Sequence, residues 1–204
     1  MWSNPVSSED ELRELLGEPD DKAYEKEIDL LDAHAQAFIA RSPFFVLATS
    51  SIDGTADASP RGGPPGFVTV LDEHRLAWAD YRGNRRADSH ANVLERPGVG
   101  LVFFLPGLGE TLRVNGRATL VRDPELLAAL PTGGATPTLA FGVTVDTVYL
   151  HCAKAFRRSG LWDPSTWPDE LPSPARILRD HRQAPVPEEA IAADLEEAYR
   201  KRLW

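Results

Sequence analysis

Residues 44–61 read FFVLATSSIDGTADASPR, and this stretch decides the fold class. Its first part, Phe44–Thr49, is a continuous apolar run, which is typical of a strand buried on both faces. The dipeptide Asp53-Gly54 is a signal for a tight hairpin turn. Residues 55–61 then read as a strand that returns beside the first. The stretch therefore predicts an antiparallel β-hairpin.

Further short strands follow the hairpin at close spacing. We expect them at residues 67–71, 75–79, 99–105, 111–121 and 144–151, which makes about seven strands in all. Short helices are expected at residues 84–95 and 123–130, and the second begins with Asp123-Pro124, a favourable helix start. Many short strands with tight turns favour an antiparallel barrel over a sheet of βαβ units.

Helical segments flank the predicted barrel. A short helix is expected before Gly17, with Leu12, Leu15 and Leu16 in an apolar stripe, and a longer one from Asp21 to about Ala40. After Trp162 the chain is rich in proline, and two helices fit between the prolines, at about 174–181 and 187–202. We therefore expect an N-terminal helical extension at 1–40, a barrel at 41–162 and a proline-rich helical arm at 163–204.

Composition and charge narrow the classes of function. The chain has 204 residues, of which 42% are hydrophobic and 26% charged, as is normal for a soluble globular protein. With 22 basic and 31 acidic side chains the net charge is −9, which argues against general binding to nucleic acid or to anionic membranes. Cys152 is the only cysteine, so an internal disulfide is excluded. With no signal-peptide pattern and no long apolar run, we expect a cytoplasmic protein.

The most informative polar stretch is DYRGNRRADS at residues 80–89. Asn84 suits a helix N-cap, which would place Arg85 and Arg86 in the first turn. Cations there oppose the helix dipole at a cost of about 0.3–1 kcal/mol each. A phosphate between the arginines would reverse that cost. The alternative interpretation is that these arginines are solvated and paired with Asp80 and Asp88.

Two other segments carry candidate binding residues. Arg61 ends a strand just before the loop at 62–66, whose glycines would let the backbone approach a flat ligand closely; a bulged barrel corner is the structural alternative. In residues 110–117, alternation places Arg113 and Asn115 on one face of a strand, which would line a polar cleft or simply face solvent.

Several familiar chemistries find no support in the sequence. The five histidines show no metal-ligand spacing, and we expect no metal. There is no nucleophile elbow, no P-loop and no dinucleotide fingerprint, and the pair His151-Cys152 is best interpreted as structural. A plausible phosphate site without an evident nucleophile favours a phosphorylated organic cofactor that brings its own chemistry.

Four motifs in order carry a family resemblance: SPRGGPPGF at 59–67, RGNRRAD at 82–88, GETLRVNGRA at 109–118 and HCAKAFRRSGLW at 151–162. With them, residues 22–170 resemble the FMN-binding split-barrel proteins of the pyridoxamine 5'-phosphate oxidase superfamily, and more closely a bacterial subgroup of probable FMN-dependent enzymes. The chain departs from that pattern at Tyr81-Arg82-Gly83, where Arg-Pro-Gly is expected, and at Arg85, where Asn is usual. The resemblance implies a mainly β (α+β) fold, an antiparallel split barrel with flanking helices.

The resemblance also implies a homodimer with an FMN site at each side of the subunit interface. Arg85 and Arg86 resemble the family's basic pair that holds the FMN phosphate, and Arg61 resembles the arginine beside the flavin. Arg113 and Trp162 would lie near the ring or close the pocket. The same motifs supply the other candidate cofactor-binding residues, which are Ser59, Gly62, Tyr81, Arg82 and Asn84.

The predicted function is that of an FMN-dependent oxidoreductase acting on an unidentified small molecule through flavin N5. No side chain stands out as a catalytic acid or base. Two alternatives remain open: a split-barrel protein that binds the deazaflavin F420 or heme, and a flavin-binding protein without enzymatic activity. The acidic chain supplies few basic residues for the polyglutamate tail of F420, which favours FMN.

Overall fold

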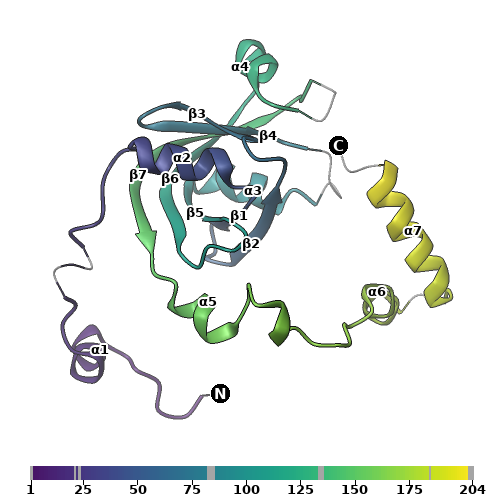
Figure 1. Cartoon of the computed structure of the whole chain (residues 1–204), viewed down its shortest axis with the longest axis horizontal. Coiled ribbons are helices and arrows are strands. Elements are labelled where there is room, and N and C mark those ends of the chain that lie inside the picture. The colour runs from purple at the N-terminus through teal and green to yellow at the C-terminus, as the bar shows by residue number, and fades with distance from the viewer. Residues whose placement is uncertain are drawn as a thin grey trace.

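The computed structural model describes residues 2–20, 22, 24–81, 86–132, 136–183 and 185–201. Seven strands form one antiparallel sheet in the order β2-β1-β5-β6-β7-β4-β3. Figure 1 shows this sheet curling into a barrel, with helices α2 and α3 beside it. The bounds are β1 Phe44–Ser50, β2 Ala56–Gly62, β3 Val68–Asp72, β4 Arg75–Ala79, β5 Gly98–Phe104, β6 Thr111–Val121 and β7 Ala140–His151. The predicted antiparallel split barrel is confirmed.

Strand β1 is buried on one face, so the expectation that both faces are buried is wrong. Phe45 and Leu47 are fully buried, whereas Phe44 and Ala48 are exposed. The strand pairs with β2 on one side and β5 on the other, and only its inner face meets the core of the barrel. Its outer face is therefore available to another surface.

Helix α2 spans Ala33–Arg41 and is much shorter than the predicted helix from Asp21. Asp32 caps it by accepting a hydrogen bond of 2.8 Å from the amide of Ala35. The preceding segment instead pairs with β7: the Ile28 amide donates to the Val148 carbonyl at 3.0 Å, and the Val148 amide donates back at 2.7 Å. This pairing between distant segments overrides the helical spacing of the apolar residues.

The other helices agree with the sequence more closely. Helix α1 spans Glu9–Leu16, α4 spans Pro124–Ala129 with Asp123 as its cap, α6 spans Pro174–Arg182 and α7 spans Glu188–Lys201. Helix α3, Asp88–Glu95, begins later than expected, and α5, Lys154–Ser159, with the short 3-10 helix η2, Pro164–Thr166, was not predicted. Figure 1 shows α1 and the α6–α7 pair outside the barrel.

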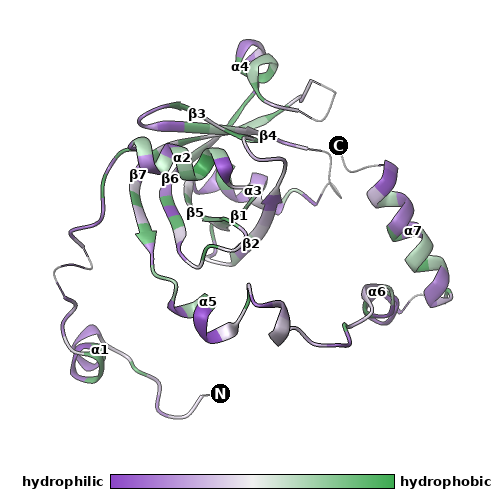
Figure 2. Ribbon diagram, viewed as in Figure 1, coloured by the Kyte–Doolittle hydropathy of each residue, from purple (hydrophilic) through white to green (hydrophobic). Residues whose placement is uncertain are grey.

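Aromatic side chains fill the interior of the barrel. Phe45, Phe103 and Phe141 are fully buried, and Trp78 and Phe67 nearly so. The Trp78 and Phe141 rings stack with centroids 5.1 Å apart and an interplanar angle of 4°. Figure 2 shows hydrophobic residues concentrated on the barrel strands, with mixed hydropathy on α1 and α7. None of the helices within the described ranges is long and apolar enough to cross a bilayer.

The β1–β2 turn has a pH-sensitive carboxylate. Asp53 accepts hydrogen bonds from the Ser51 hydroxyl and, at 3.0 Å, from the Thr55 amide, and these lower its pKa from 3.8 to about 2. A carboxyl whose pKa is lower in the folded state stabilises the fold above its unfolded pKa and loses that effect as the pH falls. We expect the stability difference between wild type and Asp53→Asn to shrink between about pH 4 and pH 2. Urea denaturation across this range tests it, and a difference independent of pH would contradict it.

Candidate functional site

Strand β2 presents three polar side chains on one face. Asp57, Ser59 and Arg61 alternate along the strand, and their sheet partners on β1 are Thr49, Leu47 and Phe45, all buried. Because directly paired residues of neighbouring strands share a face, Asp57, Ser59 and Arg61 point to the inner side of the sheet, where α3 lies. The edge strand therefore contributes a polar rim to an otherwise apolar interior.

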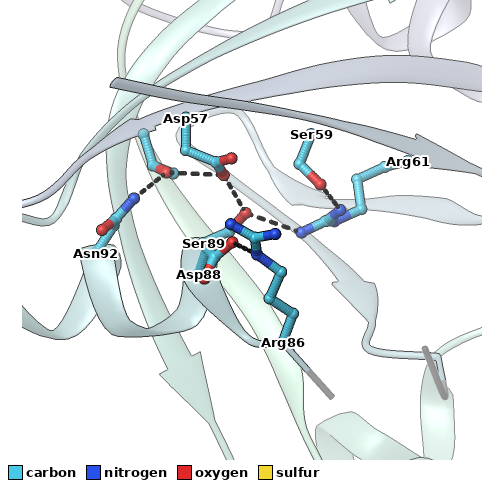
Figure 3. A network of polar contacts seen from close by, with 8 residues as sticks. Asp57, Ser59, Arg61, Arg86, Asp88, Ser89 and Asn92 are labelled. Atoms are coloured by element: carbon cyan, nitrogen blue, oxygen red, sulfur yellow. Dashed lines mark hydrogen bonds and ion pairs between the residues drawn. The ribbon is translucent and has the colours of Figure 1, made fainter. Parts of the chain in front are cut away.

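Helix α3 completes a hydrogen-bonded network with this rim (Figure 3). The Ser89 hydroxyl donates to Asp57 Oδ2 at 2.8 Å and accepts from Arg61 Nη2 at 3.2 Å. One turn further along, Asn92 Nδ2 donates to Thr49 Oγ1 at 2.9 Å, and that hydroxyl contacts Asp57 Oδ2 at 3.5 Å. Ser89 thus holds the carboxylate and the guanidinium in fixed positions.

Arg61 is half-buried, and its guanidinium forms no salt bridge with any of the described residues. Its Nη1 donates to the Ser59 hydroxyl and, at 3.0 Å, to the Pro60 carbonyl. Within the described ranges no carboxylate lies within salt-bridge distance of Arg61. Burial lowers the pKa of its guanidinium, and the charges of Asp80 and Asp57 oppose that shift. The side chain nevertheless stays charged, since arginine does not deprotonate in proteins, and two of its five N–H groups remain available.

A histidine–aspartate contact lies close to Arg61. His90 Nε2 lies 3.1 Å from Asp80 Oδ1, and the imidazole ring packs on Phe141 with centroids 4.8 Å apart. The Arg61 guanidinium lies 6.0 Å from the centroid of the same Phe141 ring. Phe141 therefore links the two polar groups to the aromatic core.

The start of α3 differs from the sequence prediction. Arg86 was expected in the first turn, but the helix begins at Asp88 and Arg86 precedes it. Ala87, between them, has a left-handed backbone with φ 58° and ψ 25°, and no side chain caps the helix. Arg86 forms an ion pair with Asp88, as the solvated-arginine alternative predicted. Arg86 therefore does not lie in the first turn of α3, because Ala87, with its left-handed backbone, stands between Arg86 and the first helical residue.

The remaining candidates of this group lie at the ends of strands. The Tyr81 hydroxyl donates to the Pro131 carbonyl at 3.2 Å, and burial of the ring raises the pKa of the phenol. Gly62 ends β2 and has ordinary space beside it, whereas a Cβ on the next residue, Gly63, would lie 2.8 Å from the Phe67 side chain. Arg82, Asn84 and Arg85 lie outside the described residues.

Arg113 and Trp162 lie on the other face of the sheet. Arg113 pairs with Val102 and Tyr149, and its guanidinium lies 5.2 Å from the Tyr149 ring centroid. Trp162 stacks on Phe156 at 5.6 Å and donates from Nε1 to the Leu108 carbonyl at 2.8 Å. Because Phe156 contacts Phe104, which pairs with the outward-facing Phe44, this group belongs to the outer face. The structure brings Ser59 and Arg61 together but separates them from Arg113 and Trp162.

Several residues of the network are not among the candidates that the sequence motifs supply. Asp57 belongs to the same period-2 pattern as Ser59 and Arg61, so alternation along β2 could have identified it. Ser89 and Asn92, three residues apart, share one face of α3, which is the corresponding helical signal. The Asp80–His90 pair had no local signal, because only the folded barrel brings His90 of α3 to Asp80, the residue after β4.

The fold defines the class of the protein as an antiparallel split barrel, and the edge strand of this barrel carries an arginine-containing candidate site. The family model described as pyridoxamine 5'-phosphate oxidase matches residues 31–152, and the chain belongs to this family. The match begins just before α2, ends one residue after β7 and leaves α5, α6 and α7 outside. No curated protein matches the sequence.

Solved structures with a similar fold are distant in sequence. A HupZ variant from Group A Streptococcus has a TM-score of 0.49 and 11% identity, over 59% of this chain and 99% of that one. A putative pyridoxamine 5'-phosphate oxidase from Lactobacillus delbrueckii has a TM-score of 0.45 and 19% identity, over 60% and 99%. A pyridoxamine 5'-phosphate oxidase-related FMN-binding protein from Nostoc punctiforme has a TM-score of 0.40 and 12% identity, over 55% and 75%.

Proposed function

We propose that the protein is an FMN-dependent oxidoreductase that uses the site around Arg61. The observation that carries the proposal is the half-buried guanidinium of Arg61, which lacks a carboxylate partner within the described ranges and keeps two N–H donors. Membership of the pyridoxamine 5'-phosphate oxidase family supports a flavin as the ligand. A half-buried cation with no carboxylate in direct contact is only partly compensated by the charges of Asp80 and Asp57, and an anionic or electron-rich ligand would compensate it further.

The residues present fit FMN in their chemistry. Arg61, with the hydroxyl of Ser59, offers hydrogen bonds to the carbonyl-bearing edge of a flavin, where positive charge favours the reduced ring. Arg86, which is largely exposed at the start of α3, would hold the phosphate together with Arg82 and Arg85. When bound, FMN would supply transfer of hydride or single electrons. The chain's own contribution is to bind and orient it and to exclude water with the aromatic core.

We further propose that the protein works as a homodimer with the cofactor at the interface. Ser59 and Arg61 face the inside of the sheet, and Arg113 and Trp162 face the outside. If one cofactor contacts both groups, the simplest arrangement takes one group from each subunit. The outer face of β1 and β5 also exposes Phe44, which a partner could cover.

The nature of the bound cofactor tests the proposal. We expect purified protein, or protein reconstituted with flavin, to show the absorption spectrum of an oxidised flavin, and denaturation to release FMN. Chromatography of the released compound distinguishes FMN from FAD, and the spectrum of the intact protein distinguishes flavin from F420 and heme. Anaerobic reduction by NADH or NADPH followed by air then tests turnover. Release of FAD, or failure to bind any flavin, would contradict the proposed function.

A further inference from the structure

The surface around α5 combines positive charge with exposed aromatic side chains. Helix α5 carries Lys154, Arg157 and Arg158 and no acidic residue, and the segment that follows exposes Leu161, Trp162 and Trp167. Trp167 Nε1 donates to the backbone carbonyl of Leu161 at 3.1 Å, which holds the Trp167 ring close to Leu161. Within the described ranges none of the three basic side chains forms an ion pair. We call these six residues the α5 patch.

Helix α1 has the complementary character. Leu12, Leu15 and Leu16 form one apolar stripe, and the structure leaves α1 without a buried residue. The helix carries four acidic side chains, Glu9, Asp10, Glu11 and Glu14, against the single basic side chain of Arg13. A helix of eight residues is marginally stable on its own, and it gains stability when its leucine stripe packs on another surface.

We infer that α1 of a second copy of the chain docks on the α5 patch. The leucine stripe would cover Leu161 and Trp167, and the acidic flank of α1 would face Arg157 and Arg158. Opposite charges and two exposed apolar surfaces are thereby matched at one contact. The α5 patch lies beside the outer face of the sheet, where Phe104 contacts Phe156 of α5.

The arrangement of a single chain favours an exchange between subunits. Figure 1 shows α1 standing apart from α5 and from the barrel. The segment between them is anchored where Ile28 pairs with Val148, so α1 extends away from its own barrel. The inference rests on the homodimer proposed above and adds to it a specific contact in trans.

Disulfide trapping between two different chains tests the contact, because Cys152 is the only native cysteine, is exposed and lies just before α5. A tagged full-length chain carrying Leu16→Cys and Cys152→Ser is mixed with the wild-type chain under mild oxidation. We expect a disulfide-linked heterodimer, identified by mass. The matched control is Asp10→Cys with Cys152→Ser, since Asp10 points away from the leucine stripe of α1, and its heterodimer should form about tenfold more slowly.

Charge reversal adds a second readout to the same assay. Arg157→Glu with Arg158→Glu in the otherwise wild-type partner should slow formation of the Leu16→Cys heterodimer about fivefold to tenfold, whereas Arg122→Glu, at an exposed arginine elsewhere, should not. Light scattering on the same samples before oxidation reports the oligomeric state.

Three outcomes would overturn the inference. A Leu16→Cys heterodimer that forms no faster than that of the Asp10→Cys control would overturn the α1 contact and leave the homodimer standing. So would a Leu16→Cys chain that retains its native Cys152, if its disulfide closes within one chain rather than between two. A monomer at micromolar concentration would overturn both the contact and the homodimer.

Discussion

Replacing Arg61 by alanine is expected to weaken FMN binding roughly 10- to 150-fold. A charge-assisted hydrogen bond contributes on the order of 1.5–3 kcal/mol, and about 1.4 kcal/mol corresponds to a factor of ten in affinity. The guanidinium already has its position fixed by Ser59 and Ser89, so little ordering is lost when a ligand binds. Titration of the apoprotein with FMN, followed by quenching of flavin fluorescence, measures the dissociation constant.

A lysine variant shows whether FMN binding depends on the planar guanidinium of Arg61 or on its charge alone, and a second variant serves as the control. Arg61→Lys keeps a positive charge but cannot reach both hydroxyls with one planar group, so its affinity should fall between wild type and alanine. Arg75→Ala removes an exposed arginine that pairs with Asp72 on another part of the sheet, and should bind FMN like wild type. If Arg61→Ala also binds like wild type, the cofactor does not use this site.

Replacing Phe141 by alanine should cost about 3–5 kcal/mol of folding stability, because it removes a fully buried aromatic ring from a packed core. The ring stacks on Trp78 on one side and contacts His90, and the Arg61 guanidinium lies over it. The substitution would also remove the ring surface that His90 and the Arg61 guanidinium contact. Urea denaturation of the apoprotein measures the loss independently of any cofactor.

Phe156 provides the comparison for this core substitution. It is half-buried on the outer face, where it contacts Phe104 and Trp162, so Phe156→Ala should cost clearly less than Phe141→Ala. Phe141→Leu, which fills most of the cavity, should also lose less. If Phe141→Ala and Phe156→Ala lower the free energy of unfolding equally, the buried ring of Phe141 contributes no more to stability than the half-buried ring of Phe156.

Local signals in the sequence determined the strands and most of the helices. Strand β6 spans Thr111–Val121 as its alternation predicts, the hairpin turns at Asp53-Gly54, and α4 begins after its Asp123 cap. Each of these features depends on residues within one or two turns of the chain, where side-chain periodicity and backbone preferences act directly. The four motifs also determined the family, because their order along the chain is itself sequence information.

The tertiary structure alone decided how the candidate residues group. Asp57 and Ser89 are far apart in sequence, yet the packing of α3 on β2 joins them. The folded barrel likewise brings His90 of α3 to Asp80, the residue after β4. Strand register places Arg61 and Arg113 on opposite faces of one sheet, which no local pattern reveals. Pairing between Ile28 and Val148 likewise replaced a predicted helix. In each case the deciding interaction is a hydrogen bond or packing contact between segments distant along the chain, whose geometry exists only once the barrel has closed.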